Sequence, residues 1–274
     1  MHAWELFPKK KLGQNFLSDP STVRTIISRG NVDPGDVVLE IGAGLGALTV
    51  PLGTAAGKVF AVEKDDRLIS LLEAELALHK AENVSLIQGD ILSLDIPAIA
   101  LQEKAKLLVF GNLPYNISSQ ILVKIIECRR HVSRCVFMFQ KELAQRLMAG
   151  PGTKDYGRIS VMLQYCGEIR HITTVPAHLF FPKPKIDSEV IEIDFTKPSP
   201  HQATDEAFLF RVVKAAFSKR RKTLKNALST SELDMETPVV SNALETAGIN
   251  PLRRAETLNV AEFVRLGEAL RTSD

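Results

Sequence analysis

The segment Asn112-Leu113-Pro114-Tyr115 places an amide, a rigid turn and an aromatic ring directly after the apolar run Leu107 to Phe110. Pro114 disfavours helical geometry at Leu113, so the backbone carbonyls around Asn112 and Leu113 remain available as hydrogen-bond acceptors. The ring of Tyr115 offers a face on which a base can stack. Together these groups suit the binding of a planar base that carries an exocyclic amine. Taken alone, the segment also fits an ordinary turn in which Asn112 caps the next helix.

Carboxylates end two earlier apolar runs of the sequence. Glu63 lies about 20 residues after Gly42, where a carboxylate can accept hydrogen bonds from both hydroxyls of a ribose. Asp90 is followed by Ile91, so a carboxylate that accepts from an exocyclic amine stands beside a side chain that can cover a ring face. Each carboxylate by itself also fits a surface turn.

A glycine loop follows the first apolar run, in the segment Glu40-Ile41-Gly42-Ala43-Gly44-Leu45-Gly46. Glycines at Gly42 and Gly44 allow a ligand to approach the backbone closely, which predicts a nucleotide-like cofactor. Nicotinamide and flavin enzymes share such loops, and Ala47 occupies the position of the third glycine in their fingerprint, which tolerates alanine. The stronger argument is the series, because the ends of four successive parallel strands share one edge of a sheet.

Short β-type runs alternate with helical stretches from Val37 to about Phe139, which predicts an α/β fold with a parallel sheet and crossover helices. Two later runs, Ile169 to Val175 and Glu189 to Phe195, are expected to form a closing antiparallel pair. The expected strands are Val37–Ile41, Val59–Val62, Val84–Gln88, Leu107–Phe110 and Cys135–Phe139, and the expected helices are Leu45–Ala55, Asp66–His79 and Ser118–Cys128.

The Pro-rich segment Lys197-Pro198-Ser199-Pro200-His201 predicts a domain boundary. Residues 1–197 are expected to form the catalytic domain and residues 198–274 a small helical domain. Within the first, residues 1–35 comprise a basic segment, Pro8 to Leu17, and a helix capped at Ser18-Asp19-Pro20.

Basic residues gather in the predicted helical domain without a single acid between them, so the remainder of the chain is net acidic. Such a concentration of positive charge is what contact with a phosphate backbone requires. A solvated helix face is the alternative. The residues are Arg211, Lys214, Lys219, Arg220, Arg221, Lys222 and Lys225.

Composition narrows the class of protein. The 274 residues are 45% hydrophobic, enough for a sizeable core, yet they contain no apolar run of membrane-spanning length and no signal-type start. We therefore expect a cytosolic protein. The three cysteines, Cys128, Cys135 and Cys166, lack metal-type spacing and are expected to be reduced core thiols, with no metal site.

With these motifs in this order, the chain resembles S-adenosylmethionine-dependent methyltransferases that act on exocyclic amines, and among them the ribosomal RNA adenine N6-dimethyltransferase family. Three further segments carry the resemblance: Lys11 to Leu17, Phe181 to Ser188, and Arg220 to Asn226. The resemblance implies a Rossmann-like sheet. The segment Arg220 to Asn226 and the late Arg254-Ala255-Glu256-Thr257-Leu258 resemble the branch of the family that modifies small-subunit (16S) rRNA near its 3′ end. The alternative is the macrolide-resistance branch, which modifies large-subunit rRNA. The archaeal and eukaryotic branch fits less well.

The resemblance also implies roles for single residues. Gly42 and Gly44 would line the methionine and ribose end of S-adenosyl-L-methionine, Glu63 would hold the ribose, and Asp90 with Ile91 the adenine. Asn15 and Leu17 would close over the cofactor. Asn112, which would also contact the cofactor, and the Leu113 carbonyl would accept from the target amine, while Tyr115 and Phe181 would sandwich the flipped base. The expected partner is the assembling small ribosomal subunit, bound by a monomer. A protein-amide methyltransferase and a non-enzymatic RNA-binding assembly factor remain open.

Overall fold

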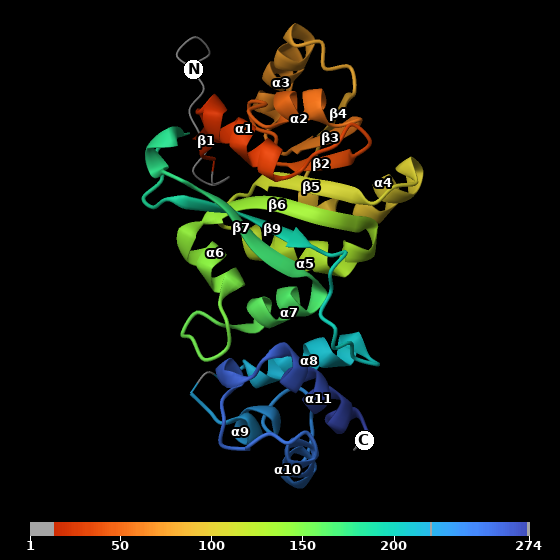
Figure 1. The fold of residues 1–274 in the computed structure, drawn as a ribbon, viewed down its shortest axis with the longest axis vertical. Helices are drawn as coiled ribbons and strands as arrows, with labels where there is room; N and C mark the ends of the chain where they lie inside the picture. The colour runs from red at the N-terminus through yellow and green to blue at the C-terminus, as the bar shows by residue number, and fades with distance from the viewer. Residues whose placement is uncertain (1–13, 220, 273–274) are drawn as a thin grey trace. The chain divides into compact units, whose positions relative to one another are not determined.

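The computed structural model describes residues 14–219 and 221–272, and its chain divides into two compact units (Figure 1). The first unit contains the residues up to Ala144 together with Arg170–Thr196. The second contains Gln145–Ile169 together with the chain from Lys197 onward. The chain therefore crosses between units three times, whereas the sequence indicated one crossing, at 197 and 198. The segment of residues 145–169, expected in the first domain, groups with the C-terminal helices.

The first unit is built on a seven-stranded sheet in the order β4-β3-β2-β5-β6-β9-β7, which confirms the α/β fold (Figure 1). Neighbouring strands from β4 to β6 are parallel, and β9 runs antiparallel to β6. The strands β2, β3 and β5 are almost entirely buried, as parallel strands covered on both faces must be. The bounds are β2 (Val37–Ile41), β3 (Lys58–Glu63), β4 (Val84–Gln88), β5 (Leu107–Asn112), β6 (Val132–Gln140), β7 (Glu168–Val175) and β9 (Ser188–Asp194).

Helices connect these strands, and the first begins as the sequence indicated. Asp19 caps α1, its carboxylate accepting from the Thr22 amide. The helix after the glycine loop starts at Thr49 rather than Leu45, because Gly46 has a positive φ of 86° that no α-helix allows. The helices are α1 (Pro20–Arg29), α2 (Thr49–Ala55), α3 (Asp66–Leu78), α4 (Ile96–Glu103), α5 (Ser118–Cys128) and α6 (Lys141–Met148), with 3-10 turns η3 (Ile91–Ser93), η4 (Arg129–His131) and η5 (Ala177–Leu179).

A separate two-stranded sheet joins the N-terminal segment to a loop far away in the sequence. It pairs β1 (Phe16–Leu17) with β8 (Phe180–Phe181), and Phe16 stands opposite Phe181. The hydroxyl and the amide of Ser18 both bond to the Leu179 carbonyl. These contacts hold the residues around Asn15 beside the main sheet.

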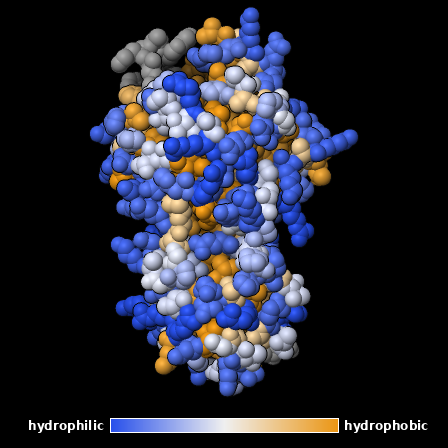
Figure 2. Space-filling model, viewed as in Figure 1, coloured by the Kyte–Doolittle hydropathy of each residue, from blue (hydrophilic) through white to orange (hydrophobic). Residues whose placement is uncertain are grey.

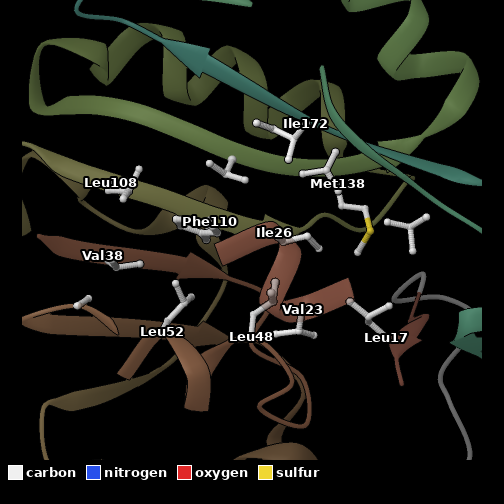
Figure 3. Packing of buried hydrophobic residues seen from close by; sticks show 14 of the residues in the cluster. Leu17, Val23, Ile26, Val38, Leu48, Leu52, Leu108, Phe110, Met138 and Ile172 are labelled. Carbon is white, nitrogen blue, oxygen red and sulfur yellow. The ribbon is translucent and has the colours of Figure 1, made fainter. Parts of the chain in front are cut away.

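The hydrophobic core of the first unit holds helix α1 against the main sheet (Figure 3). Val23 and Ile26 of α1 pack with Leu108 and Phe110 of β5, all less than 5% exposed. A Cβ placed on Gly30 at the end of α1 would come within 2.8 Å of the Phe110 ring. Burying each large apolar side chain contributes roughly 1.5–3 kcal/mol, so α1 and the strand that ends at Asn112 are held firmly together.

The second unit contains only helices among its described elements beyond residue 197. The ring of Phe217 stacks on that of Phe263 with 5.9 Å between the ring centroids, and it makes an edge-type contact with the Tyr156 ring at 6.3 Å, so the three rings link three segments of the unit.

Hydrophilic residues cover most of the face seen in Figure 2, and no helix within residues 14–219 and 221–272 is long and apolar enough to cross a membrane. The elements of the second unit are α7 (Arg158–Cys166), α8 (Glu206–Ala216), α9 (Leu224–Leu228), α10 (Thr237–Thr246), η6 (Ala255–Thr257) and α11 (Val260–Arg271).

Candidate functional site

A cavity of about 290 Å³ opens at the carboxyl edge of the main sheet. Strand β3 adjoins β2 on one side and β5 adjoins it on the other, so the sheet reverses its winding there. Ligands of open α/β sheets bind at such a switch point. The wall contains every residue expected to bind cofactor or base except Phe181: Asn15, Leu17, Gly42, Gly44, Glu63, Asp90, Ile91, Asn112, Leu113 and Tyr115.

The glycine loop forms the floor beneath the cavity. Gly42, Gly44 and Gly46 have φ values of 77°, 59° and 86°, in the left-handed region that favours glycine. A Cβ on Gly44 would lie 3.3 Å from the Phe16 ring, so the loop and the N-terminal segment approach closely. The absence of side chains at these glycines therefore lets a ligand approach the backbone closely.

Glu63 is the anchor of this loop. One carboxylate oxygen accepts from the Gly44 amide at 2.8 Å, and the other accepts from the amides of Lys64 and Asp65 at 2.8 and 2.7 Å. The side chain is 7% exposed. Each carboxylate oxygen has two acceptor sites, so Glu63 retains capacity for hydroxyl donors while it holds the loop in shape.

Glu40, at the end of β2, is a cavity residue that the sequence analysis did not single out. Its Oε2 is buried and accepts no hydrogen bond of standard geometry from the residues that the structure describes. Burial raises the pKa of the Glu40 carboxyl to about 7; the nearby Thr49 hydroxyl opposes the rise and the charge of Glu63 adds to it. The sequence signal that could have identified Glu40 is the presence of a carboxylate inside the otherwise apolar run Val37–Ile41.

Asp90 closes the cavity on the side of β4. Its Oδ1 accepts from the Leu92 amide at 2.9 Å and thereby caps η3, while its Oδ2 accepts from Lys64 Nζ at 2.7 Å. The Lys64 ammonium and the Leu92 amide lower the pKa of the Asp90 carboxyl. Ile91 is buried beside it, as the expected apolar cover requires.

Asn112 lies on the opposite side of the glycine loop, at the end of β5. Its amide nitrogen donates to the Asn15 carbonyl at 2.8 Å. Because a carbonyl can only accept, this contact identifies the nitrogen and leaves Oδ1 as the free acceptor of the side chain among the described contacts. The sequence offered helix capping as an alternative, but α5 begins at Ser118 without a side-chain cap, so Asn112 is not its cap.

The residues after Asn112 form a braced turn. Leu113 is buried, and its amide donates to the Met138 carbonyl at 3.3 Å. The Pro114 carbonyl accepts from the Ser118 hydroxyl at 2.9 Å. The Tyr115 hydroxyl lies 3.0 Å from Ser188 Oγ, and burial raises the pKa of this tyrosine. Ser188 thus positions the ring of Tyr115, whereas the sequence indicates Ser188 only as the last residue of the segment Phe181 to Ser188.

Phe181 lies outside the cavity wall and is 47% exposed. It pairs with Phe16, which does line the cavity. The predicted partner of Tyr115 is therefore joined to the site through β1, and its role in clamping a base stays a prediction.

Comparison with known proteins decides the family. Residues 7–271 match the profile of the family described as Ribosomal RNA adenine dimethylase. The chain belongs to the ribosomal RNA adenine dimethylase family. It is 53% identical to "Ribosomal RNA small subunit methyltransferase A" of Desulforapulum autotrophicum. The alignment extends over 266 residues and covers 97% of this chain and 93% of that protein. The protein of the same name from Moorella thermoacetica is 42% identical over 273 residues, with the same coverage.

Two solved structures share the whole dimethylase fold. A dimethyladenosine transferase from Plasmodium falciparum superposes with a TM-score of 0.81 at 25% identity, covering 94% of this chain and 98% of that one. The 23S rRNA methyltransferase ErmE superposes with a TM-score of 0.69 at 26% identity, covering 93% and 99%. The Rossmann-like fold and the helical C-terminal region are therefore confirmed.

S-adenosyl-L-methionine, the cofactor of this family, fits the cavity. The glycine loop leaves room for a ligand against the backbone, and Glu40 keeps a buried oxygen that has no hydrogen-bond partner within residues 14–219 and 221–272. Carboxylates at Glu63 and Asp90 face the same space from neighbouring strands. Such an acceptor-rich wall suits a ligand that carries ammonium, hydroxyl and amine donors.

The basic residues of the second unit do not share one helix. Helix α8 ends at Ala216 and α9 begins at Leu224, so Lys219, Arg221 and Lys222 lie in the connecting turn. Lys214 pairs with Glu232 at 2.7 Å, Lys219 donates to Thr230, and Arg211 lies over the Phe208 ring. Arg221 and Lys222 are exposed, Lys225 is half-buried, and Arg220 lies outside the described residues.

The cysteines behave as core residues. Cys128, Cys135 and Cys166 are all buried free thiols, as expected. Burial raises the pKa of the Cys128 thiol to about 11, which keeps it protonated and unreactive.

Proposed function

We propose that this protein transfers methyl groups from S-adenosyl-L-methionine to the N6 amines of adenines near the 3′ end of small-subunit (16S) rRNA, forming N6,N6-dimethyladenine. The observation that carries the proposal is the orientation of Asn112, whose nitrogen is fixed on Asn15 so that its oxygen remains as an acceptor in the cavity. The relatives named above, both small-subunit methyltransferases, favour this branch over the large-subunit one.

The amine of adenine is a poor nucleophile because its lone pair is delocalised into the ring. Asn112 Oδ1 and the Leu113 carbonyl accept its two hydrogens on one side, which stabilises the positive charge that develops on nitrogen and aims the lone pair. The cofactor supplies an activated sulfonium methyl group. An amide is too weak a base to take the proton, and the alkylated nitrogen is acidic enough to release it to water.

The target base must leave its stack before it enters the cavity. The Tyr115 ring, fixed through Ser188, recovers part of that cost, at about 1–3 kcal/mol per stacked base. In a second transfer the monomethyl amine has one hydrogen left, so one of the two acceptors loses its donor. Because both acceptors are neutral, this loss leaves no buried charge unpaired.

RNA binding is assigned to the exposed part of the basic cluster. Arg221 and Lys222 carry no ion pair among the described contacts, whereas Lys214 is neutralised by Glu232. Arg221→Glu should weaken particle binding and reduce its salt dependence, while Lys214→Glu should have a smaller effect. Unchanged cofactor affinity in both variants is part of the expectation. We further propose that the protein acts as a monomer, in the cytoplasm, on assembling small subunits.

The test is methyl transfer to purified ribosomal particles. Under-modified small-subunit particles should gain N6,N6-dimethyladenine near the 3′ end of their RNA, measured by mass spectrometry of nuclease fragments. Large-subunit particles should gain none. Methylation of large-subunit RNA or of a protein amide would overturn the proposal. Small-subunit assembly that persists in an Asn112→Ala, Glu63→Ala double variant, with no methyl transfer by wild type, would instead favour a non-enzymatic RNA-binding assembly factor with a relict site.

A further inference from the structure

Lys64 stands in the cavity wall without a part in the proposed chemistry. It follows the last residue of β3, and Asp90 lies just beyond the end of β4, where Glu63 is in register with Gln88. The two strands are neighbours in the sheet (Figure 1). The Lys64 ammonium reaches across this edge and bonds to Asp90 Oδ2 at 2.7 Å.

Asp90 is thereby held from two directions. The Leu92 amide takes one carboxylate oxygen at 2.9 Å and Lys64 takes the other. Lys124 of α5 adds a second positive charge, since its ammonium donates to the Leu92 carbonyl of the same turn at 3.0 Å. Within the part of the chain that the structure describes, the charged groups that act on Asp90 are these two lysines, and both lower the pKa of its carboxyl, the Lys64 hydrogen bond most of all.

An ionised carboxylate can only accept hydrogen bonds. Oδ2 has two acceptor sites, so it can hold the Lys64 ammonium and still accept from a ligand. A purine with a 6-amino group offers the required donor. A purine with a 6-oxo group would place an acceptor against an anion, unless Asp90 first gained a proton.

We propose that Lys64 is a positioning residue that keeps Asp90 as a fixed, anionic acceptor and so makes the cavity select a 6-amino purine nucleoside over its 6-oxo counterpart. This inference rests on the proposed function, because it assigns the purine of the cofactor to the Asp90 side of the cavity. It adds a residue that touches neither the reacting methyl nor the target amine.

A purely stabilising role predicts a different result. The Lys64 side chain is 57% exposed and that of Asp90 is 30% exposed. Exposed ion pairs add little to stability. Removing Lys64 should therefore leave folding unchanged and alter the choice of ligand.

The experiment measures the affinities of S-adenosylhomocysteine and S-inosylhomocysteine by isothermal titration calorimetry on the full chain. The variants are Lys64→Met, Lys64→Arg and the control Lys58→Met, which removes a comparable ion pair, Lys58 with Glu103 at 2.6 Å. Wild type should prefer the adenosyl ligand. In Lys64→Met the preference at pH 7 should fall about tenfold, as a rise of about one unit in the pKa of Asp90 would cause. Lys64→Arg should restore the preference, and Lys58→Met should match wild type.

The pH dependence separates positioning through charge from general packing. Because the inosyl ligand requires a proton on Asp90, its affinity should rise as the pH falls from 7 to 5, while the adenosyl affinity stays flat. An unchanged preference in Lys64→Met, or an equal loss for both ligands, would overturn the role of Lys64. Failure of wild type to bind either ligand would instead overturn the proposed function.

Discussion

The two ends of the cavity differ in the charge of their acceptors. The carboxylate end consists of Glu40, Glu63 and Asp90, at or just beyond the ends of β2, β3 and β4. The amide end consists of Asn112 and the turn to Tyr115, after β5. Carboxyl oxygens, among them the ionised carboxylate of Asp90, hold a ligand rich in donors. Neutral oxygens orient an amine without keeping its proton, so the difference separates the binding of the cofactor from the activation of the target.

The two ends also differ in how their acceptors are fixed. Glu63 is held by three backbone amides, which makes it part of the fold. Asn112 is held by one hydrogen bond from its nitrogen, and its oxygen is spared. Loss of the Glu63 carboxylate should therefore cost stability and cofactor affinity, and loss of the Asn112 amide should cost rate.

The largest effect is expected for Glu63→Ala. Three amides, two of them buried, lose their acceptor, and each unsatisfied amide costs about 1–3 kcal/mol. We expect the free energy of unfolding to fall by about 3 kcal/mol or more, and S-adenosylhomocysteine binding to become undetectable. Urea denaturation and calorimetry measure both. Glu63→Gln keeps one oxygen and should lose less; equal stability of Glu63→Ala and wild type would contradict the anchoring role.

Asn112→Asp tests the amide end with a nearly isosteric change. A carboxylate cannot donate to the Asn15 carbonyl, so the side chain turns away or loses its anchor. By analogy with loss of one oriented hydrogen-bonding group from an active site, kcat should fall about 10²–10³-fold. Single-turnover transfer at saturating cofactor measures the loss. A fall in cofactor affinity of the same size, with kcat preserved, would place Asn112 at the wrong end of the cavity.

Glu40→Gln should remove the contribution of Glu40 to the pH dependence of the free energy of unfolding. The pKa of Glu40 is about 7 in the folded protein against 4.5 for the free group. Between these values only the folded state keeps the proton, so wild-type stability falls as the pH rises from 4.5 to 7 and then levels off. At pH 8 the variant should be more stable than wild type by at most about 3 kcal/mol, and at pH 4 the difference should vanish.

Parallel urea titrations of both proteins at pH 4, 6 and 8 measure this difference. A constant difference across the range would show that Glu40 is not buried in its neutral form.

The smallest effect is expected for Tyr115→Phe. The ring remains available for stacking, and the variant loses only the hydrogen bond to Ser188, worth about 1 kcal/mol. We expect a rise in KM of less than about tenfold with little change in kcat. Tyr115→Ala, as the comparison, should raise KM further because the stacking face is lost. Equal kinetics for the two variants would remove the ring from base binding.

The strands and their polar ends were predictable because each rests on local signals. Val37–Ile41 and Ser118–Cys128 have the predicted bounds, since apolar runs and helical periodicity determine them. Helix α4 was missed although Asp95 caps it, because Pro97 near its start was not recognised as a first-turn proline. The Pro-rich segment indicated one crossing between units, and nothing local marks those at residues 144 and 169.

Contacts between distant residues were beyond local reasoning. Lys64 and Asp90 are brought together by strand register, and Tyr115 and Ser188 by the antiparallel strand β9. The sequence placed each residue at an edge of the sheet. The orientation of the Asn112 amide depends on Asn15, and the anchoring of Glu63 depends on backbone amides of the loop, and only the folded chain identifies these partners.

The most direct test of the central claim measures binding and methyl transfer on one variant, Asn112→Ala. S-adenosylhomocysteine affinity is determined by calorimetry, and N6,N6-dimethyladenine in small-subunit RNA is determined by mass spectrometry after incubation with saturating cofactor. The account predicts cofactor affinity within a few-fold of wild type and a loss of dimethyladenine of about 100-fold or more. Wild-type amounts of dimethyladenine in the RNA would contradict it.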